Sequence, residues 1–256
     1  MNKFKEETLS RIEENRKNSA LTDAAKLFML ESTVPKYSYN FLAQGVPIIQ
    51  YPQDIIAMQE IIWSVKPDLI IETGIAHGGS LIWSASMLAL LDINEAIQKG
   101  ESLNPNKSKR KVLGIDIDIR SHNKELIESH PMISRIQMIE GPSTDPAIIQ
   151  LVKKISIDYK KILVCLDSNH THNHVYSELE AYAPLTSVDS YCVVFDTIIE
   201  DLPNNIYPDR PWDPGNNPKT AVKQFLEDNT EFEIDKNIQN KLLITVSPDG
   251  YLKRVR

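Results

Sequence analysis

The sequence predicts a single α/β unit of the Rossmann-like type, with a mostly parallel sheet, helices on both faces and a helical extension at the N-terminus. Apolar strand-like runs alternate with helical patterns along most of the 256 residues, which is the order typical of a parallel sheet. A glycine-rich turn joins the first of these strands to a helix, and acidic residues follow several later strands. We therefore divide the chain into an extension over residues 1–53, packing on the core, and a domain over residues 54–256.

The extension begins with two segments of helical character. Asn2–Lys17 is highly charged with few apolar residues, which predicts an exposed helix, and Leu21–Glu31 has an amphipathic pattern. Val34–Gln53 contains prolines and a glycine, so we expect it to be extended and irregular. Asp54 then stands at the N-cap position of a helix predicted over Ile55–Val65.

Strands and helices alternate from there to the C-terminus. The predicted strands lie within Asp68–Gly74, Val112–Ile117, Ile136–Glu140, Ile162–Leu166 and Tyr191–Phe195, followed by a closing pair at Phe232–Ile234 and Leu242–Val246. The predicted helices are Ile82–Leu91, Lys124–Glu128, Pro146–Lys154, His174–Tyr182 and Thr220–Asp228. Between the first helix and the second strand, Ile93–Lys111 is polar and ends in a basic cluster. It is interpreted as a solvated surface insertion, with phosphate binding as the alternative.

Composition and charge limit the classes of partner. The formal net charge is −7 and the pI is about 5.4, so the chain has no general attraction to nucleic acid or anionic membranes, and a small-molecule substrate is expected. Cys165 and Cys192 lie in apolar runs, which predicts buried free thiols and a reducing, cytoplasmic location. The charged N-terminus has no apolar signal region, and no apolar run is as long as the roughly 18 residues that span a membrane.

The glycine-rich turn has the sequence Glu72-Thr-Gly-Ile-Ala-His-Gly-Gly-Ser80. Its glycines allow a sharp turn and a close approach to a ligand, and the following helix directs free N–H groups toward that ligand. The spacing differs from the dinucleotide pattern but agrees with a site for S-adenosylmethionine (SAM), whose cationic groups suit an acidic strand end. An ordinary strand–helix turn is the alternative. The expected cofactor residues are Glu72, Gly74, His77, Gly78, Gly79 and Ser80.

Two further strand ends continue this site. Asp116, with Asp118 as second choice, ends the second strand, where an acid accepts hydrogen bonds from ribose hydroxyls. Ser143 and Asp145 follow the third strand, where they are placed to contact adenine or ribose. Three strand ends in this order favour a SAM-binding site.

The fourth and fifth strands end in Asp167 and Asp196. Carboxylates from two adjacent strand ends can share a hard cation such as Mg²⁺, with Glu200 or Asp201 as further candidate ligands. Such a metal lowers the pKa of an acceptor hydroxyl, and His170 is the candidate general base; Asp167 also belongs to the expected catalytic and cofactor residues. The alternatives are a capping role for Asp167, a packing or surface role for His172 and His174, and solvated positions for Glu200 and Asp201.

A long polar loop, Asp209–Thr220, lies between the fifth strand and the next helix. Its prolines and tryptophan, beside a strand rim, are typical of a substrate lid, in which Arg210, Trp212 and Lys219 face the acceptor. A rigid surface loop that caps the following helix is the alternative.

These motifs together resemble the cephalosporin hydroxylase family, a bacterial group of SAM-dependent methyltransferases that includes rhamnosyl O-methyltransferase-like proteins. The resemblance implies a class I methyltransferase fold, SAM as cofactor and a divalent metal held by Asp167 and Asp196. In members of the family with a clear metal site an acid precedes the second aspartate, and here Phe195 stands in that place. The matching pieces are Asn40-Phe41, Gly45–Gln50, Pro52–Asp54, Pro67–Ser80, Gly114–Arg120, His122-Asn123, Leu166–His172, Val193–Thr197 and Pro214–Val222.

Three hypotheses of function follow from the residues and the resemblance. The first is O-methylation of a small-molecule hydroxyl, on a sugar or secondary metabolite, by a homo-oligomeric enzyme whose N-terminal helices mediate assembly. The second is metal-dependent hydroxylation, with Asp167, His170 and His174 as an iron site. The third is a non-catalytic SAM-binding partner protein, which is favoured if Phe195 has removed the metal site.

Overall fold

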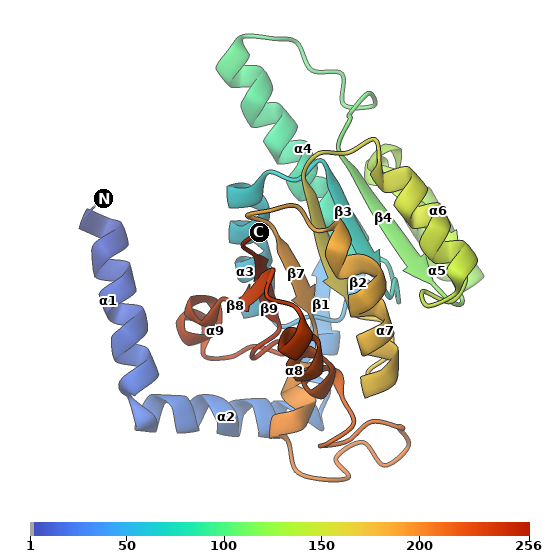
Figure 1. The fold of residues 1–256 in the computed structure, drawn as a ribbon. Coiled ribbons are helices and arrows are strands. Elements are labelled where there is room, and N and C mark those ends of the chain that lie inside the picture. The colour runs from blue at the N-terminus through green and yellow to red at the C-terminus, as the bar shows by residue number, and fades with distance from the viewer. Residues whose placement is uncertain (1–2) are drawn as a thin grey trace.

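The computed structural model describes residues 3–256 and contains a seven-stranded sheet in the order β5-β4-β3-β6-β7-β9-β8. The five strands from β5 to β7 are parallel, and β9 pairs antiparallel with both β7 and β8 (Figure 1). The predicted α/β class is therefore confirmed. The strands are β3 (Leu69–Thr73), β4 (Lys111–Asp116), β5 (Ile136–Glu140), β6 (Ile162–Leu166), β7 (Tyr191–Val194), β8 (Phe232–Ile234) and β9 (Tyr251–Arg254).

Two apolar layers cover the faces of this sheet. Side chains along each strand alternate between the layers, so that Ile70 and Leu163 face α3, α4 and α5 while Ile71 and Val164 face α6, α7 and α8. The central strands β3 and β6 are buried along their whole length, because helices lie on both sides. The helices are α3 (Pro52–Val65), α4 (Gly79–Lys99), α5 (Ser121–Glu128), α6 (Pro146–Ser156), α7 (His172–Tyr182) and α8 (Pro218–Asp228), with α9 (Lys236–Leu242) beside the closing strands.

The strand order reverses between β3 and β6. The chain passes outward from β3 to β4 and β5, then returns to the other side of β3 through β6 and β7. Parallel sheets bind ligands in the crevice outside the carboxyl ends of their strands at such a point. The residues that end β3, β4, β6 and β7 therefore share one rim.

The N-terminal region has two parts with different packing. The helices α1 (Lys3–Lys17) and α2 (Ser19–Thr33) form an arm at the edge of the molecule (Figure 1) and contact the body through few buried residues. Helix α1 lies beside α9, and Ile12 is its only buried residue among the described residues, while Met29 of α2 packs in the core. The first residue of the helix predicted over Asn2–Lys17 lies outside the described residues. In contrast, the hairpin of β1 (Phe41–Ala43) and β2 (Val46–Ile48) packs against the body, which gives regular structure to a segment we expected to be irregular.

Two sequence expectations for these elements are wrong. The last strand is β9, not Leu242–Val246, because residue 242 still belongs to α9 and the Val246 N–H donates to the Asp54 carboxylate. Asp54 lies inside α3 rather than at its N-cap, since Tyr51 precedes the helix and Pro52 begins it. Asp54 is fully buried, and burial raises its pKa to about 6 despite hydrogen bonds from Thr245, Tyr251 and Val246.

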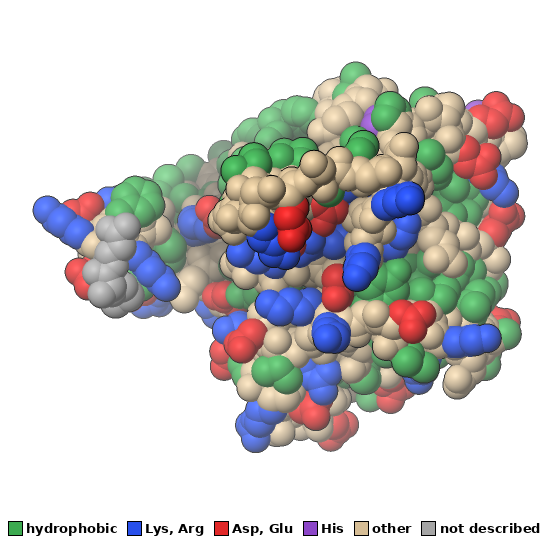
Figure 2. All heavy atoms as spheres, turned by 90° about the horizontal axis from the view of Figure 1, so that it is seen from above, with side chains coloured by type: hydrophobic (Ala, Val, Ile, Leu, Met, Phe, Trp, Pro, Cys, Tyr) green, Lys and Arg blue, Asp and Glu red, His purple; other side chains and the backbone are tan. Residues whose placement is uncertain are grey.

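The predicted insertion is shorter than expected, because α4 continues through Lys99. Among the described residues, α4 alone is long and apolar enough to cross a membrane by these two criteria, but its inner face packs in the core of the fold. The remaining segment, which leads into β4, is held by ion pairs from Arg110 to Asp92 and Glu95 of α4. Arg135, which precedes β5, also pairs with Asp92. Figure 2 shows several Lys and Arg side chains near the centre of the visible face with a few acidic side chains beside them, and the phosphate-binding alternative stays a prediction.

Candidate active site

The glycine turn lies directly against the end of β6. Gly74 has φ +88°, and a Cβ there would lie 2.0 Å from the Asp167 carbonyl oxygen, so only glycine allows the two segments to meet. Gly78 has the same φ, and a Cβ would meet the Ile127 side chain. Gly79 has another role, because a Cβ there would lie 2.3 Å from the Pro47 carbonyl oxygen. The last glycine thus admits the N-terminal hairpin rather than shaping the turn.

Glu72 lies in the interior at the start of the turn. Its side chain accepts a hydrogen bond from the Ser80 hydroxyl, which brings the two ends of the motif together. Burial raises the pKa of Glu72 to about 8; the hydrogen bond from Ser80 opposes this rise, and the nearby charge of Asp167 adds to it. A cation arriving beside Glu72 would therefore favour its ionised form.

Asp116 holds the loop that follows β3. One carboxylate oxygen accepts from the backbone N–H groups of Ile75 and Ala76, at 2.7 and 3.2 Å. His77 contacts Asn123 on the same side, with 3.4 Å between Nδ1 and Oδ1. The predicted cofactor residues Asp116 and His77 are therefore at one edge of the crevice, next to the glycine turn.

Ser143 lies on the other side of the crevice in a buried polar network. Its hydroxyl is 3.1 Å from His174 Nε2, which also contacts the Ser168 hydroxyl at 3.1 Å. Ser168 in turn donates to the buried Glu178 at 2.7 Å. His174 is thus part of the structure around Ser143, while Asp145, the other candidate, caps α6.

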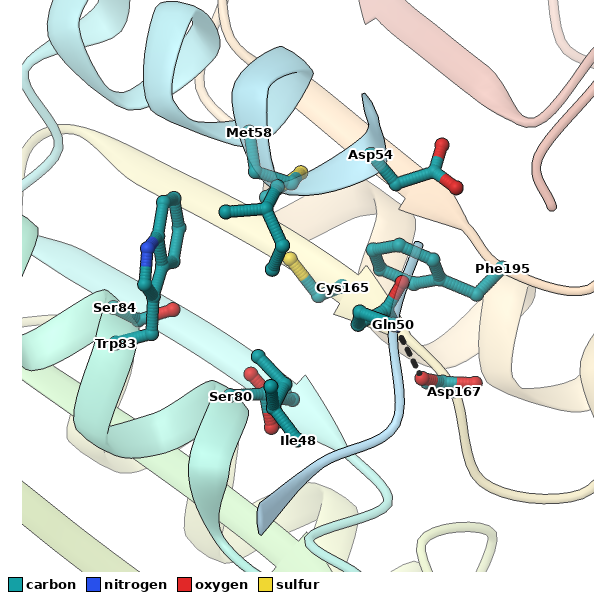
Figure 3. Close-up of a pocket in the computed structure, with 12 residues that line it drawn as sticks. Ile48, Gln50, Asp54, Met58, Ser80, Trp83, Ser84, Cys165, Asp167 and Phe195 are labelled. Atoms are coloured by element: carbon teal, nitrogen blue, oxygen red, sulfur yellow. Dashed lines mark hydrogen bonds between the residues drawn. The ribbon is translucent and has the colours of Figure 1, made fainter. Parts of the chain in front are cut away.

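A pocket opens between the glycine turn, α3, α4 and the end of β6 (Figure 3). Of the residues that the structure describes, three line it with carboxyl groups, Asp54, Glu72 and Asp167, and no Lys, Arg or His lines it. Such a lining favours a ligand with positive charge at this end. The lining residues are Ile48, Gln50, Asp54, Ile55, Met58, Glu72, Ser80, Trp83, Ser84, Cys165, Asp167 and Phe195.

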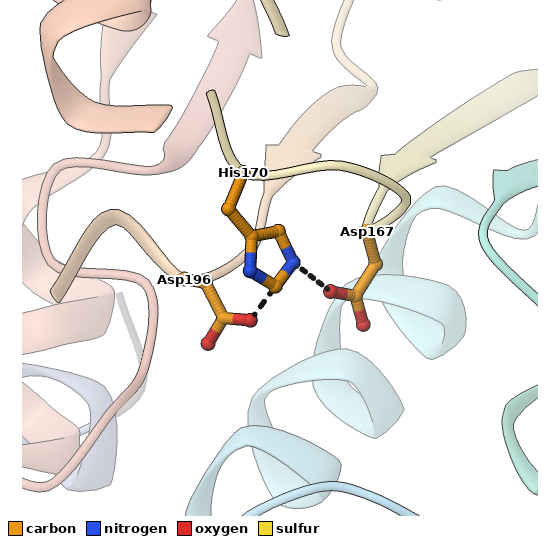
Figure 4. A group of neighbouring side chains, drawn as sticks. All are labelled: Asp167, His170 and Asp196. Atoms are coloured by element: carbon orange, nitrogen blue, oxygen red, sulfur yellow. Dashed lines mark ion pairs between the residues drawn. The ribbon is translucent and has the colours of Figure 1, made fainter. Parts of the chain in front are cut away.

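Asp167 also belongs to a second group at the rim, with His170 and Asp196 (Figure 4). His170 Nε2 lies 3.1 Å from Asp196 Oδ2 and 3.7 Å from Asp167 Oδ1, and one ligand atom of each residue lies within 4.8 Å of the others. Asp196 has φ +55°, a left-handed conformation that Asp tolerates better than most residues. The predicted ends of the fourth and fifth strands therefore do come together.

Charge couples the members of this group. Burial raises the pKa of Asp167 to about 7; the nearby His170 imidazole opposes this rise, and the charge of Asp196 adds to it. Burial lowers the pKa of His170, but Asp196 and Asp167 outweigh this effect and bring the pKa above its ordinary value. A divalent cation between the two carboxylates would change this balance, because it favours their ionised forms.

Several candidates from the sequence lie outside this group. Glu200 accepts from Gly215 and Asn217, and Asp201 pairs with Lys219 at 2.6 Å, so both hold the loop that leads into α8. Lys219 is buried by this pairing and does not face an acceptor. His172 bonds Thr220 and Gln224 of α8, as its packing alternative predicts.

The same loop carries Trp212 onto the site. The Trp212 side chain packs against the His170 imidazole, with 4.7 Å between ring centroids, and the Arg210 guanidinium carbon lies 5.2 Å from the centroid of the Trp212 ring. The loop therefore covers one side of the candidate base.

Gln50 is a polar residue at this site that was not expected from the sequence. Its side-chain nitrogen donates to Asp167 Oδ2 at 3.2 Å, although 117 residues separate them. Its position in the Gly45–Gln50 motif was the available signal, but an isolated glutamine after an irregular segment indicates no chemistry by itself.

Comparisons with known proteins agree with this geometry. Residues 35–255 match the family model described as rhamnosyl O-methyltransferase/CmcI. The rhamnosyl O-methyltransferase of Mycobacterium tuberculosis H37Rv is 31% identical over 212 residues, covering 82% of this chain and 76% of the relative. The protein of the same name from Mycobacterium leprae is 29% identical, with coverages of 82% and 81%.

Solved structures with this fold include CmcI. A form described with Mg and SAM has a TM-score of 0.54 at 17% identity, over 85% of this chain and 78% of the other. The apo structure of CmcI has a TM-score of 0.53 at 17% identity, over 85% and 77% of the two chains. At this identity the similarity supports the fold, which is that of the class I methyltransferases.

Proposed function

The chain belongs to the rhamnosyl O-methyltransferase/CmcI family, and from this membership we propose that it transfers the methyl group of SAM to a hydroxyl of a sugar or another small metabolite. The observation that carries the proposal is the shared position of Asp167. Its carboxyl group lines the carboxylate-rich pocket and also belongs to the group with His170 and Asp196. A cationic donor and an acceptor hydroxyl bound in these two places would be neighbours.

In this proposal, different residues of the crevice bind different parts of SAM. Glu72, Ser80 and the three glycines of the turn form the wall for the cationic amino-acid end of SAM. Asp116 and His77 lie where the ribose would bind, and Ser143 lies where the adenine would bind. The relative CmcI, whose structure is described with Mg and SAM, supports this choice of cofactor.

The donor set at the rim fits a divalent metal. Asp167 and Asp196 offer carboxylate oxygens from two adjacent strand ends, which Mg²⁺ accepts together with water and substrate oxygens. A bound Mg²⁺ would supply Lewis acidity toward an acceptor hydroxyl. Phe195 is buried and offers no ligand atom, so two carboxylates rather than three would hold the metal.

His170 would take the proton that the acceptor hydroxyl loses. Its Nε2 lies 3.1 Å from Asp196 Oδ2 and donates to that carboxylate, so Nδ1 is the nitrogen that would accept the proton while Asp196 stabilises the resulting imidazolium. Trp212 restricts the imidazole ring from one side. Because the sulfonium is already a good leaving group, these side chains act mainly by positioning the acceptor and by excluding water.

Three wider expectations accompany this proposal. The boundary at residue 53, between extension and methyltransferase domain, stays a prediction, as does assembly into homo-oligomers through the N-terminal helices. A cytoplasmic location agrees with Cys165 and Cys192, which are buried free thiols. The iron-site hypothesis loses support, because His174 bonds Ser143 and Ser168 instead of joining Asp167 and His170.

Calorimetry and a transfer assay test the proposed function. We expect the purified protein to bind SAM with micromolar affinity and NADH not at all, and to transfer labelled methyl groups from SAM to L-rhamnosides with Mg²⁺ but not with EDTA. The variant Asp167→Ala should lose turnover while retaining affinity for S-adenosylhomocysteine within about tenfold. Asp158→Ala, at an exposed position, is the matched control. If the wild-type protein does not bind SAM, the proposed methyltransferase activity is excluded.

A further inference from the structure

Gln50 has a buried polar atom for which the structure provides no partner. The residue is 8% exposed, and its carbonyl oxygen Oε1 is buried without a hydrogen bond among the described residues. A buried amide oxygen without a partner is destabilising, so native structures rarely keep one unless water or a ligand completes it. The side chain lines the carboxylate-rich pocket, and Figure 3 shows it between Asp167 and Cys165.

The orientation of this amide follows from its neighbour. Asp167 offers carboxylate oxygens, which accept hydrogen bonds, so the nitrogen of Gln50 faces Asp167 and donates at 3.2 Å. The oxygen must then lie on the other side of the amide. Gln50 Oε1 is thus a hydrogen-bond acceptor to which no described residue donates.

The chemistry of the pocket limits the group that can bind this oxygen. The ligand group must donate a hydrogen bond, and the nearby Glu72 and Asp167 favour a positive charge. SAM carries two cationic groups, of which the sulfonium has no hydrogen to donate and the α-ammonium has three. The α-carboxylate is excluded, because it only accepts and would be repelled.

We propose that Gln50 is a cofactor-binding residue, whose side-chain oxygen accepts a hydrogen bond from the α-ammonium group of SAM while its nitrogen holds Asp167. This inference rests on the proposed function, since it requires SAM in the crevice. The N-terminal region then supplies part of the cofactor site, although the glycine turn and the strand ends belong to the later domain. It also links the cofactor to the metal and acceptor group through a single side chain.

Gln53 provides a matched control. It lies three positions further along the chain, and its Oε1 is also buried without a hydrogen bond among the described residues, but it does not line the pocket. The variants Gln50→Met and Gln53→Met remove the same amide at similar volume. Thermal unfolding establishes that both variants are folded before any binding is measured.

The experiment compares S-adenosylhomocysteine with its analogue that lacks the α-amino group, by isothermal titration calorimetry. Wild-type protein and Gln53→Met should bind the analogue about 10- to 100-fold more weakly, which corresponds to one hydrogen bond to a charged group. Gln50→Met should bind S-adenosylhomocysteine more weakly and distinguish the two ligands by a factor at least about fivefold smaller than that of the wild-type protein, while Glu72 and Asp167 account for the discrimination that remains. A general structural effect would weaken both ligands equally and leave the ratio unchanged.

The possible failures are distinguishable. Full discrimination by a folded Gln50→Met variant would overturn the role of Gln50 while leaving the SAM site in place. Equal binding of both ligands by the wild-type protein would have the same meaning. If the wild-type protein binds neither ligand, the proposed function fails, and the inference fails with it. If Gln50→Met does not fold, Gln50→Leu and Gln50→Asn replace it, and unchanged discrimination in either overturns the inference.

Discussion

Glu72 should make cofactor affinity depend on pH. Its pKa is about 8 in the unliganded protein, because burial disfavours the ionised form, so the side chain is mainly protonated at pH 6. A cationic ligand beside it favours ionisation and lowers that pKa. Binding therefore releases a proton, and affinity should rise as the pH increases toward 8.

The magnitude follows from the displacement of the pKa. While the pH lies below the pKa of the free protein and above that of the complex, one released proton changes affinity by about tenfold per pH unit. Between pH 6.0 and 7.5 the contribution of Glu72 is therefore up to about 30-fold. The same pKa has a consequence for stability. Since Glu72 has an ordinary pKa of 4.5, the folded state takes up a proton, and its stability falls between pH 4.5 and about 8 by up to roughly 5 kcal/mol.

Calorimetry across this range measures the linkage directly. Titrations of S-adenosylhomocysteine in phosphate and Tris buffers, whose ionisation enthalpies differ, give the number of protons released. Glu72→Gln retains a hydrogen-bond acceptor for Ser80 but cannot titrate. Asp167 has a pKa of about 7 and contributes its own release, so the informative quantity is the difference between the wild-type protein and the variant.

From the raised pKa of Glu72 we expect the wild-type protein to release nearly one proton more than Glu72→Gln at pH 6.5. Equal proton release by both proteins, with parallel slopes of affinity against pH, would refute it. In that case Glu72 would be ionised before the ligand arrives, and its burial would not set its charge.

Three further predictions concern other parts of the molecule. His170→Gln should lower kcat by about 10²- to 10⁴-fold with little change in affinity for S-adenosylhomocysteine, and an unaltered pH–rate profile in steady-state kinetics would remove His170 as the base. Gly79→Ala should lower the free energy of unfolding by about 1–3 kcal/mol although alanine favours helices, because its Cβ would meet Pro47; urea denaturation showing a more stable variant would contradict the packing. Asp54→Asn should cost about 1–3 kcal/mol, since an amide nitrogen would face the Val246 N–H, and an unchanged midpoint of unfolding would show that this hydrogen bond is dispensable.

The parts of the site that could be predicted from sequence depend on local rules. The glycine turn, Asp116, Asp167 and Asp196 all directly follow a strand or complete its end, and the carboxyl ends of parallel strands meet at one rim. The alternation of strands and helices along the chain predicts a parallel sheet, and a parallel sheet brings the carboxyl ends of its strands to one edge. The meeting of Asp167, His170 and Asp196 could therefore be expected, although their distances could not.

The parts that could not be predicted depend on contacts between distant segments. Gln50 meets Asp167 only because the N-terminal hairpin packs on Gly79, which no local pattern indicates. The polar second half of α4 is stabilised by ion pairs of Asp92 and Glu95 with a basic residue beyond the helix, so its composition looked like that of a loop.

The error at the C-terminus has a similar cause. Leu242–Val246 has the composition of a strand, but α9 ends there. The backbone N–H of Val246, just after α9, donates to the buried carboxylate of Asp54 in α3 and is therefore not available to a neighbouring strand. Instead, Tyr251–Arg254 forms the last strand of the sheet, and Tyr251 donates a further hydrogen bond to Asp54 beside those from Thr245 and Val246.

The contact between Gly79 and Pro47 also indicates what a substitution at this glycine would mean in related proteins. The final glycine of such a turn is commonly associated with the ligand, yet here it leaves room for the backbone of another segment. A larger residue at this position would force the hairpin outward and remove Gln50 from the pocket wall. Loss of this glycine in a related chain would therefore signal a different arrangement of the N-terminal region, even where every residue around the cofactor is retained.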